Sequence, residues 1–239
     1  RKFIKLMKAF KLLIDLYEVD DYMVCATSAM RESSNGREIV EEVKEDIGLK
    51  INIIDGNQEA ELINMALGTY IDEKSYLHID VGGGSTELNI YSKRQKIASK
   101  SFKIGSVRAL DDNIPLSVWK SMNKFIAEKI GEKTKIISIG TGGNINKIFE
   151  LSNPRKNKRY LDMEKIKEIQ SYLESFSYED RINKLNLNPD RADVIIPASK
   201  IYLAAMTAAG SQKMIVPDVG LKDGLMQVLY AKNKNKKPL

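Results

Sequence analysis

The segment HIDVGGGSTELNIYS, residues 78 to 92, constrains the fold of this chain more than any other stretch. An apolar run ends at Asp80, three glycines follow at Gly82, Gly83 and Gly84, and an alternating segment resumes after Ser85. A strand that ends in successive glycines can turn several backbone N–H groups toward one point and so bind an anion. Consecutive glycines are equally typical of a tight hairpin turn, so this segment alone leaves both interpretations open.

A second segment of the same kind, SIGTGGNINKI, begins at Ser138. It predicts a buried strand over 136–139 and a helix that begins near Asn144. The loop expected between them contains Gly140, Thr141, Gly142 and Gly143. Helix N-termini favour anions, so two such loops suit a ligand with several phosphates. Neither loop matches the P-loop pattern G-x-x-x-x-G-K-[ST], and neither fits G-x-G-x-x-G well enough for a Rossmann dinucleotide site.

Two acids bracket the first glycine loop. Asp80 ends the strand before the loop, and Glu87 lies in the segment after it. Mg²⁺ takes one or two carboxylates together with phosphate oxygens and water, and it neutralises charge that develops in phosphoryl transfer. The pattern therefore predicts a Mg²⁺ site at Asp80 and Glu87. Either acid taken alone could equally be a solvated residue at a strand end.

The first part of the chain predicts helices that alternate with short strands. Residues 3 to 17 form an amphipathic helix whose apolar stripe is Phe3, Leu6, Phe10, Leu13 and Tyr17. The strand YMVCA, the loop TSAMRESSNG and a helix over 37–47 follow. The strand LKINIID then leads into the helix GNQEAELINMALGTY, which has Glu59 in its first turn.

From residue 76 the predicted elements are mainly strands, and helices return later. SYLHIDV, TELNIYS and QKIASKSFKIG form a meander with a turn at Lys93 and Arg94. Helices are expected over 115–130 and over DMEKIKEIQSYLESF, RADVIIPASKIYLAAMTAA and VGLKDGLMQVLYAK, with a last strand at KMIVP. Strands that alternate with helices indicate an α/β protein.

The composition narrows the class of protein further. The 239 residues are 43% hydrophobic, enough for one or two domains with a buried core. No apolar run approaches the roughly 18 residues that span a bilayer, so we expect a soluble, cytoplasmic protein with no membrane partner. The single cysteine, Cys25, excludes an intramolecular disulfide, and we expect it to serve core packing. A formal charge of +6 favours polyanions without distinguishing nucleic acid, nucleotide and polyphosphate.

Taken in order, the motifs of this chain resemble those of the exopolyphosphatase and guanosine pentaphosphate phosphohydrolase family (Ppx/GppA phosphatases). The resemblance covers nearly the whole chain. The motifs that carry it are ATSAMRES, IIDGNQEAELI, HIDVGGGSTEL, KIGSVRAL, SIGTGGN, RADVIIPASKI and VPDVGLKDGLM. It implies the actin, sugar-kinase and Hsp70 ATPase-like (ribonuclease H-like) fold, in which two domains flank a substrate cleft.

The resemblance also implies where the domains lie. Domain I would comprise residues 1–60, rejoined by 219–231, and domain II would comprise 61–218 with both glycine loops. Residues 232–239 would form a basic, disordered tail. Family members begin with a strand and loop of the form Asp-x-Gly-Ser-Asn-Ser, which is not found in this sequence, so we expect domain I to be incomplete. The chain resembles the short two-domain members that lack a helical C-terminal extension.

Individual roles follow from the same resemblance. The family's catalytic glutamate in G-x-E-E-A-x-L-I matches Glu59 of GNQEAELI, where Gln58 replaces the preceding acid. Glu59 would activate the attacking water, an assistance of roughly 10²–10⁴-fold. Asp80 and Glu87 would hold the metal. Phosphate binding would fall to Gly82, Gly83, Gly84, Ser85, Thr27, Ser28, Arg31, Gly140, Thr141, Gly142 and Gly143.

The function that this resemblance implies is Mg²⁺-dependent hydrolysis of terminal phosphoanhydride bonds in inorganic polyphosphate or guanosine pentaphosphate. One alternative is a non-catalytic sensor of polyphosphate or an alarmone, although a pure binder of polyanions would gain affinity by losing Glu59, Asp80 and Glu87. The other is a kinase of the same fold superfamily, for which no adenosine pocket is evident. We expect no covalent intermediate, a structural role for the only histidine, His78, no specific nucleic acid, and compatibility with a homodimer.

Overall fold

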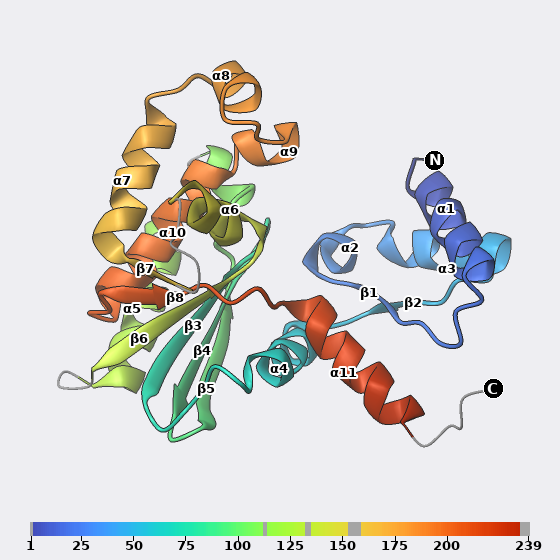
Figure 1. The fold of residues 1–239 in the computed structure, drawn as a ribbon, viewed down its shortest axis with the longest axis horizontal. Coiled ribbons are helices and arrows are strands. Elements are labelled where there is room, and N and C mark those ends of the chain that lie inside the picture. The colour runs from blue at the N-terminus through green and yellow to red at the C-terminus, as the bar shows by residue number, and fades with distance from the viewer. Residues whose placement is uncertain (1, 112–113, 132–134, 153–158, 235–239) are drawn as a thin grey trace. The chain divides into compact units, whose positions relative to one another are not determined.

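A computed structural model describes residues 2–111, 114–131, 135–152 and 159–234 of the chain. The chain divides into two compact units. Unit 1 consists of Arg1–Ala66 and Leu221–Leu239, and unit 2 of Leu67–Gly220 (Figure 1). The sequence placed the corresponding boundaries at 60/61 and 218/219.

In the part of the chain that the structure describes, unit 2 contains a six-stranded mixed sheet with the order β5-β4-β3-β6-β8-β7. Its strands are β3 (Ser75–Val81), β4 (Thr86–Ser92), β5 (Gln95–Phe102), β6 (Ile136–Thr141), β7 (Tyr160–Asp162) and β8 (Lys213–Ile215). β3, β4 and β5 form the predicted antiparallel meander, whose turn residues Lys93 and Arg94 both have positive φ angles. β6 pairs in parallel with β3, and β8 pairs in parallel with β6. The short edge strand β7, which pairs antiparallel with β8, was not predicted.

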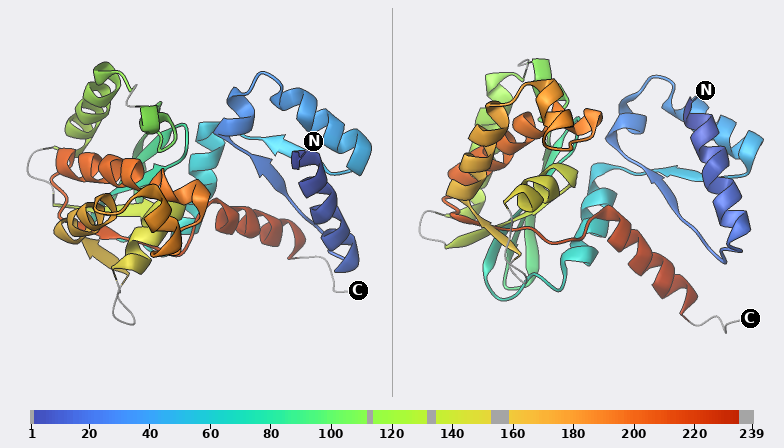
Figure 2. Two further views of the ribbon diagram at one scale, coloured as in Figure 1. Left: turned by 90° about the horizontal axis from the view of Figure 1, so that it is seen from above. Right: turned by 45° about the horizontal axis from the view of Figure 1, so that its top comes forward.

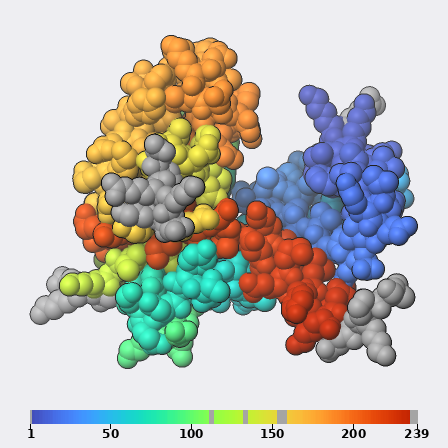
Figure 3. Space-filling model, in the orientation of Figure 1, coloured from blue at the N-terminus to red at the C-terminus, as the bar shows by residue number. Residues whose placement is uncertain are grey.

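The sheet is contacted by α5 (Leu116–Ile130), α6 (Gly143–Leu151), α7 (Met163–Glu174) and α10 (Ile195–Ala208). Unit 2 also contains the 3₁₀ turn η1 (Arg108–Asp111) and the short helices α8 (Tyr178–Asn183) and α9 (Pro189–Ala192). Figure 2 shows α10 beside the sheet, and this helix contacts β3, α5, α6 and α7. The single helix predicted over RADVIIPASKIYLAAMTAA is interrupted between α9 and α10. In the space-filling view, α7 and α8 form the orange upper part of unit 2 (Figure 3).

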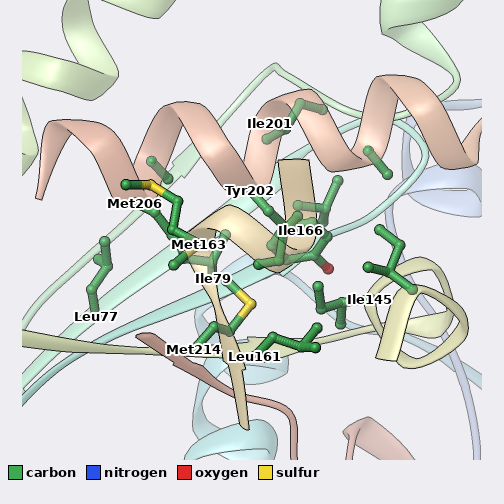
Figure 4. Close-up of a cluster of buried hydrophobic side chains, with 14 of the residues drawn as sticks. Leu77, Ile79, Ile145, Leu161, Met163, Ile166, Ile201, Tyr202, Met206 and Met214 are labelled. Carbon is green, nitrogen blue, oxygen red and sulfur yellow. The ribbon is translucent and has the colours of Figure 1, made fainter. Parts of the chain in front are cut away.

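The alternation of side chains along β3 separates an apolar face from a polar one. Leu77, Ile79 and Val81 point into the core, where Tyr202 of α10 and Met214 of β8 join them (Figure 4). Successive side chains of a strand point to opposite faces of the sheet, so His78 and Asp80 lie on the other face. The sequence of β3 therefore places apolar side chains on one face of the sheet and His78 and Asp80 on the other.

The described residues of unit 1 form a two-stranded parallel sheet, which α2 and α3 contact, together with further helices. The elements are α1 (Lys2–Leu16), β1 (Val24–Ala26), α2 (Ser28–Glu32), α3 (Gly36–Ile47), β2 (Ile51–Ile53), α4 (Gly56–Leu67) and α11 (Leu221–Asn233). A small core contains Met7, Val43, Leu49 and Ile51. Cys25, expected in a core, is only partly buried in β1, and burial raises the pKa of its thiol.

The predicted apolar stripe of α1 is wrong. Leu6, Phe10, Leu13 and Tyr17 are exposed by 51, 50, 48 and 74%, and the buried residue is Met7. Phe3 and Ile14 pack beside Met7 against the small core. Apolar residues occur all around this helix, so several stripes have helical spacing, and contacts with α3 select the one that is buried.

Two further predictions for unit 1 differ from the structure. The segment predicted as a loop after Thr27 contains the short helix α2. The tail predicted to be disordered begins within α11, which continues to Asn233. Lys232 and Asn233 both contact the Asp21 carboxylate, at 2.9 and 2.7 Å, and these hydrogen bonds lower the pKa of Asp21 to about 2. The remaining tail, 235–239, lies outside the described residues.

Across the described ranges, none of the helices combines the length and the apolar character that crossing a membrane requires.

Candidate functional site

The first glycine loop connects β3 to β4 and turns its carbonyl groups to one side. The carbonyl oxygens of Gly82, Gly83 and Gly84 accept hydrogen bonds from residues 106–108 at 2.9 to 3.1 Å. Within the described part of the chain, no group accepts a hydrogen bond from the N–H of Gly83 or Gly84. These donors are left for a ligand or water, which is the arrangement expected of an anion cradle.

Gly105 packs directly against the backbone of this glycine loop. A Cβ at position 105 would lie 2.3 Å from the carbonyl oxygen of Gly83 and 2.5 Å from the carbonyl carbon of Gly84. The backbone of the loop therefore occupies the space that any other side chain at 105 would need. The structure thus gives the motif KIGSVRAL, which the sequence left without a role, the task of holding the glycine loop.

Asp80 and Glu87 are directly opposed partners on β3 and β4. No Lys or Arg among the described residues forms a salt bridge with either. Removal from water and the nearby charge of Glu87 raise the pKa of Asp80 to about 7. The Glu87 carboxylate is buried and accepts hydrogen bonds from Ser85 Oγ at 2.7 Å and Ser101 Oγ at 2.9 Å. Two repelling carboxylates without a protein counter-charge form a site that a cation would stabilise.

The donor set of this pair fits Mg²⁺ better than a cation that requires a full protein cage. No group of three or more His, Cys, Asp or Glu side chains in the described ranges could hold a metal. Mg²⁺ commonly uses one or two carboxylates and completes its shell with waters and substrate phosphate. Asp80 and Glu87, next to free N–H donors of the glycine loop, supply that set.

The second glycine loop is shorter than predicted. β6 continues through Thr141, and α6 begins at Gly143, so Gly142 alone separates them. Gly140 lies in the strand, where a Cβ would come 2.5 Å from the sulfur of Met214. Glycine at 140 therefore has a packing reason, and Gly140 and Thr141 are strand residues and not loop residues.

Gly142 lies next to Asp80, at the end of the strand that leads into the first glycine loop. Its φ of 110° suits glycine, and a Cβ there would lie 3.2 Å from Asp80 Oδ1 and 3.3 Å from the hydroxyl of Tyr202. Tyr202 donates to the carbonyl oxygen of Thr141 at 2.5 Å and so anchors the end of β6. Asp80 and Thr141 are partners in the parallel β3–β6 ladder, so both loops leave the same edge of the sheet.

Arg191 is a residue of this site that the sequence did not identify. Its Nη2 atom lies 2.7 Å from the position that a Cβ of Gly143 would occupy, at the first turn of α6. A guanidinium at a helix N-terminus suits phosphate oxygens, because both favour anions and the planar fork can bind two oxygens. The motif RADVIIPASKI contains Arg191, but its place in this site depends on Gly143, which belongs to a distant part of the sequence.

Beside the carboxylate pair, buried polar side chains run across the same face of the sheet. Ser99 Oγ donates to Asn89 Oδ1 at 2.7 Å, Asn89 Nδ2 lies 3.1 Å from His78 Nδ1, and His78 Nε2 lies 2.8 Å from Thr141 Oγ1. Burial lowers the pKa of His78 to about 3, so the ring is neutral. His78 lies in β3, as the sequence predicted.

The other predicted residues belong to unit 1. Glu59 lies in the first turn of α4. This helix begins with a capping box, in which Asp55 Oδ1 accepts a hydrogen bond from the N–H of Gln58 at 2.9 Å and Gln58 Oε1 accepts one from the N–H of Asp55 at 3.1 Å. Gln58, which replaces an acid of the family pattern, therefore fixes the start of the helix that carries Glu59. The spacing D-x-x-Q was a signal for this cap.

Arg31, Thr27 and Ser28 lie at and within α2. Arg31 Nη1 donates to the carbonyl oxygen of Ile54 at 2.8 Å, which ties α2 to the residue before the cap of α4. Thr27 and Ser28 are partly exposed at the start of α2. Arg31 also lines a pocket of unit 1 together with Ser33, Ser34 and Arg37.

Comparison with known proteins adds to this geometry. Residues 1–233 match the family model described as the Ppx/GppA phosphatase family. The chain is 29% identical to a bifunctional 3-dehydroquinate synthase/phosphatase of Fusobacterium nucleatum, over 98% of this chain and 38% of that protein. It is 24% identical to the guanosine-5'-triphosphate,3'-diphosphate pyrophosphatase of Aeromonas hydrophila, over 90% of this chain and 46% of that protein. The chain thus spans less than half of the length of these relatives.

Two solved structures share the fold. A Ppx/GppA family member from Aquifex aeolicus superimposes with a TM-score of 0.73 at 24% identity, over 98% of this chain and 82% of that one. An exopolyphosphatase from Cytophaga hutchinsonii gives a TM-score of 0.77 at 21% identity, over 96% and 81%. The predicted α/β fold class is therefore confirmed.

Proposed function

We propose that this chain, which belongs to the Ppx/GppA phosphatase family, hydrolyses terminal phosphoanhydride bonds of inorganic polyphosphate or guanosine pentaphosphate. The observation that supports this most directly is the opposed pair Asp80 and Glu87 beside a glycine loop with available N–H donors. Proteins similar to this chain include an exopolyphosphatase and a guanosine-5'-triphosphate,3'-diphosphate pyrophosphatase, which supports both substrates.

In this proposal unit 2 binds the reacting phosphates. The N–H groups of Gly83 and Gly84 donate to phosphate oxygens, and the guanidinium of Arg191 contacts oxygens near the first turn of α6. Asp80 and Glu87 hold Mg²⁺, which when bound neutralises charge on the phosphate oxygens. The backbone of the glycine loop and the Glu87 carboxylate are held by hydrogen bonds before substrate arrives, so these groups require little reorganisation.

Unit 1 supplies the general base in the same proposal. The Glu59 carboxylate takes a proton from a water whose oxygen forms a bond to the terminal phosphorus. The bond from that phosphorus to the bridging oxygen breaks, and the shortened polyphosphate or nucleotide leaves with the electron pair. The capping box at Asp55 and Gln58 holds the first turn of α4 and therefore the backbone of Glu59.

The test is phosphate release from long-chain polyphosphate and from guanosine pentaphosphate by the purified protein, with Mg²⁺ and with EDTA. Glu59→Gln should lower the rate by roughly 10²-fold or more, because the amide cannot accept the proton. Glu61→Gln is the matched control, since Glu61 is an exposed glutamate of the same helix, and it should keep the parent's rate. Binding of polyphosphate without release by any variant would refute hydrolysis and favour a sensor.

A further inference from the structure

Gly224 lies inside a helix, near the start of α11, where glycine needs a structural reason. Glycine destabilises a helix interior more than any other residue except proline. A Cβ at position 224 would lie 2.0 Å from the carbonyl oxygen of Leu62 and 2.5 Å from its carbonyl carbon. The backbone of α4 therefore occupies the space that a side chain at 224 would need. Figure 1 shows α11 beginning beside α4.

This contact with α4 is the place where α11 is buried. The structure describes every residue of α11, and Gly224 is the only one of them that is buried. At the other end of the helix, Lys232 and Asn233 contact the Asp21 carboxylate at 2.9 and 2.7 Å. α11 is thus attached to the backbone of α4 at Gly224 and to the segment between α1 and β1 at its last turn.

The α4 residue at this contact lies one helical turn beyond Glu59. Leu62 follows Glu59 by three positions in the same helix, and about 3.6 residues make a turn. The capping box at Asp55 and Gln58 fixes where α4 begins, but it does not fix where the helix lies within unit 1. The contact at Gly224 restricts that position, because two backbones meet there with no side chain between them.

We propose that Gly224 is a positioning residue, which sets the place of the α4 turn that carries Glu59. The inference rests on the proposed function, in which the Glu59 carboxylate takes a proton from the attacking water. Non-bonded contacts of carbon are about 3.5 Å long, so a methyl group at 224 would push the two backbones apart by roughly 1 Å or more. A misplacement of about 1 Å can lower a rate by about 10²-fold.

The first test compares Gly224→Ala with Gly220→Ala. Both substitutions add one methyl group, but no atom lies within 4 Å of the carbon that is added at 220. With the substrate that the parent hydrolyses, Gly224→Ala should lower kcat by roughly 10–100-fold and leave KM within about threefold, because the proposed phosphate donors lie in unit 2. Gly220→Ala should keep both values of the parent. An unchanged kcat in Gly224→Ala, with an active parent, would overturn the inference and leave the proposed function intact.

A double-mutant cycle with Glu59→Gln separates positioning from a general loss of folded protein. If Gly224 acts through the Glu59 carboxylate, Gly224→Ala should lower the residual rate of Glu59→Gln by less than about twofold. A loss of folded enzyme would instead lower the rate by the same factor in both backgrounds. Single-turnover assays measure these slow rates. Equal factors in the two backgrounds would overturn the positioning role.

The contact itself has a test that needs no hydrolysis. Alanine favours a helix more than glycine does, so Gly224→Ala should raise the urea midpoint if the contact were absent and should lower it if the contact is present. Hydrogen exchange should increase within residues 56–67 in Gly224→Ala and not in Gly220→Ala. A higher midpoint, or unchanged exchange in α4, would overturn the inference. If both change as expected but the parent releases no phosphate, the proposed function fails, and the positioning role fails with it.

Asp21→Ala covers the case in which Gly224→Ala does not fold. This substitution removes the attachment of the last turn of α11 and adds nothing at the contact with α4. α11 can then shift, so kcat should fall by roughly 2–10-fold, and by less than about twofold when Glu59→Gln is also present. A kcat equal to the parent's in Asp21→Ala, together with a Gly224→Ala variant that does not fold, would overturn the inference.

Discussion

The two units organise their functional residues in opposite ways. In unit 2 the carboxylates and hydroxyls of the site lie on a sheet whose other face packs a large core, and nearly all of them are held by hydrogen bonds. In unit 1 the sheet has two strands in the described residues, the core is small, and the helix α1 exposes a series of large apolar side chains. Glu59 and Arg31 are partly exposed there.

This difference indicates how each unit keeps its groups in place. The site of unit 2 depends on contacts between segments that are distant in the sequence, such as Gly105 below the glycine loop and Thr141 beside Asp80. Unit 1 relies mainly on local devices, of which the capping box at Asp55 is the clearest. Substitutions in unit 2 should therefore change both function and stability, whereas substitutions in unit 1 should change one without the other.

The largest effect is expected at Asp80, where function and stability should change in opposite directions. Asp80→Asn removes a proposed metal ligand and should lower phosphate release by roughly 10²–10³-fold. The neutral amide also removes the repulsion with Glu87, so the variant should unfold at a higher denaturant concentration near neutral pH. Steady-state rates and urea titrations check both. A variant that loses activity and stability together would show that the pair is structural.

A buried leucine of unit 2 provides the next test. Leu88 of β4 is fully buried in the core, so Leu88→Ala should lower the free energy of unfolding by about 2–5 kcal/mol. Chemical denaturation with the same urea dependence as the parent would measure this loss. A cost below about 1 kcal/mol would contradict the view that the core of unit 2 is tightly packed.

The carboxylate pair also predicts a pH dependence of stability. The pKa of Asp80 is raised from 3.8 to about 7, so between these values the folded chain binds a proton that the unfolded chain has released. The free energy of unfolding should therefore fall as the pH rises through this window, by on the order of 2 kcal/mol, and Asp80→Asn should not show this contribution. Urea midpoints between pH 5 and pH 8, with EDTA present, provide the measurement. An identical slope in the variant would assign the dependence to other groups.

Gly105 tests whether the glycine loop depends on its support. Gly105→Ala places a methyl group against the backbone of Gly83 and should destabilise unit 2 by about 1–3 kcal/mol. Hydrogen exchange should increase first at residues 82–85 and 105–108. A matched change is Gly210→Ala, where no atom lies within 4 Å of the added carbon, although a positive φ adds some backbone strain. Similar exchange at the loop in both variants would contradict the supporting role.

The smallest effect is expected on the exposed side of α1. Leu16 is 73% exposed, so Leu16→Ala should change the free energy of unfolding by no more than about 0.5 kcal/mol. The same chemical change as Leu88→Ala then gives very different costs in the two units. A loss above about 1 kcal/mol would mean that this side of α1 is covered in solution.

Short-range sequence patterns were sufficient to predict the β3–β4 hairpin of unit 2. The alternation along 75–81 and 86–92 and the glycines between them predicted the hairpin with its correct strands, and the hairpin register places Asp80 opposite Glu87. The same patterns were insufficient for α1, where apolar residues occur on every side, and for Gly140 and Thr141, which belong to a strand and not to a loop. The sequence alone does not distinguish a glycine in a strand from a glycine in a loop, because the need for glycine at 140 comes from packing against Met214.

By itself, the sequence determined the α/β class, the glycine loop between two strands, the acids on either side of it and the place of Glu59 in a first helical turn. These are properties of periodicity and of residue spacing within a few positions. The tertiary structure alone decided that Arg191 lies at α6, that Gly105 packs against the glycine loop and that His78 contacts Thr141. Those contacts join segments that are distant in the sequence, and no local pattern records which segments the fold brings together.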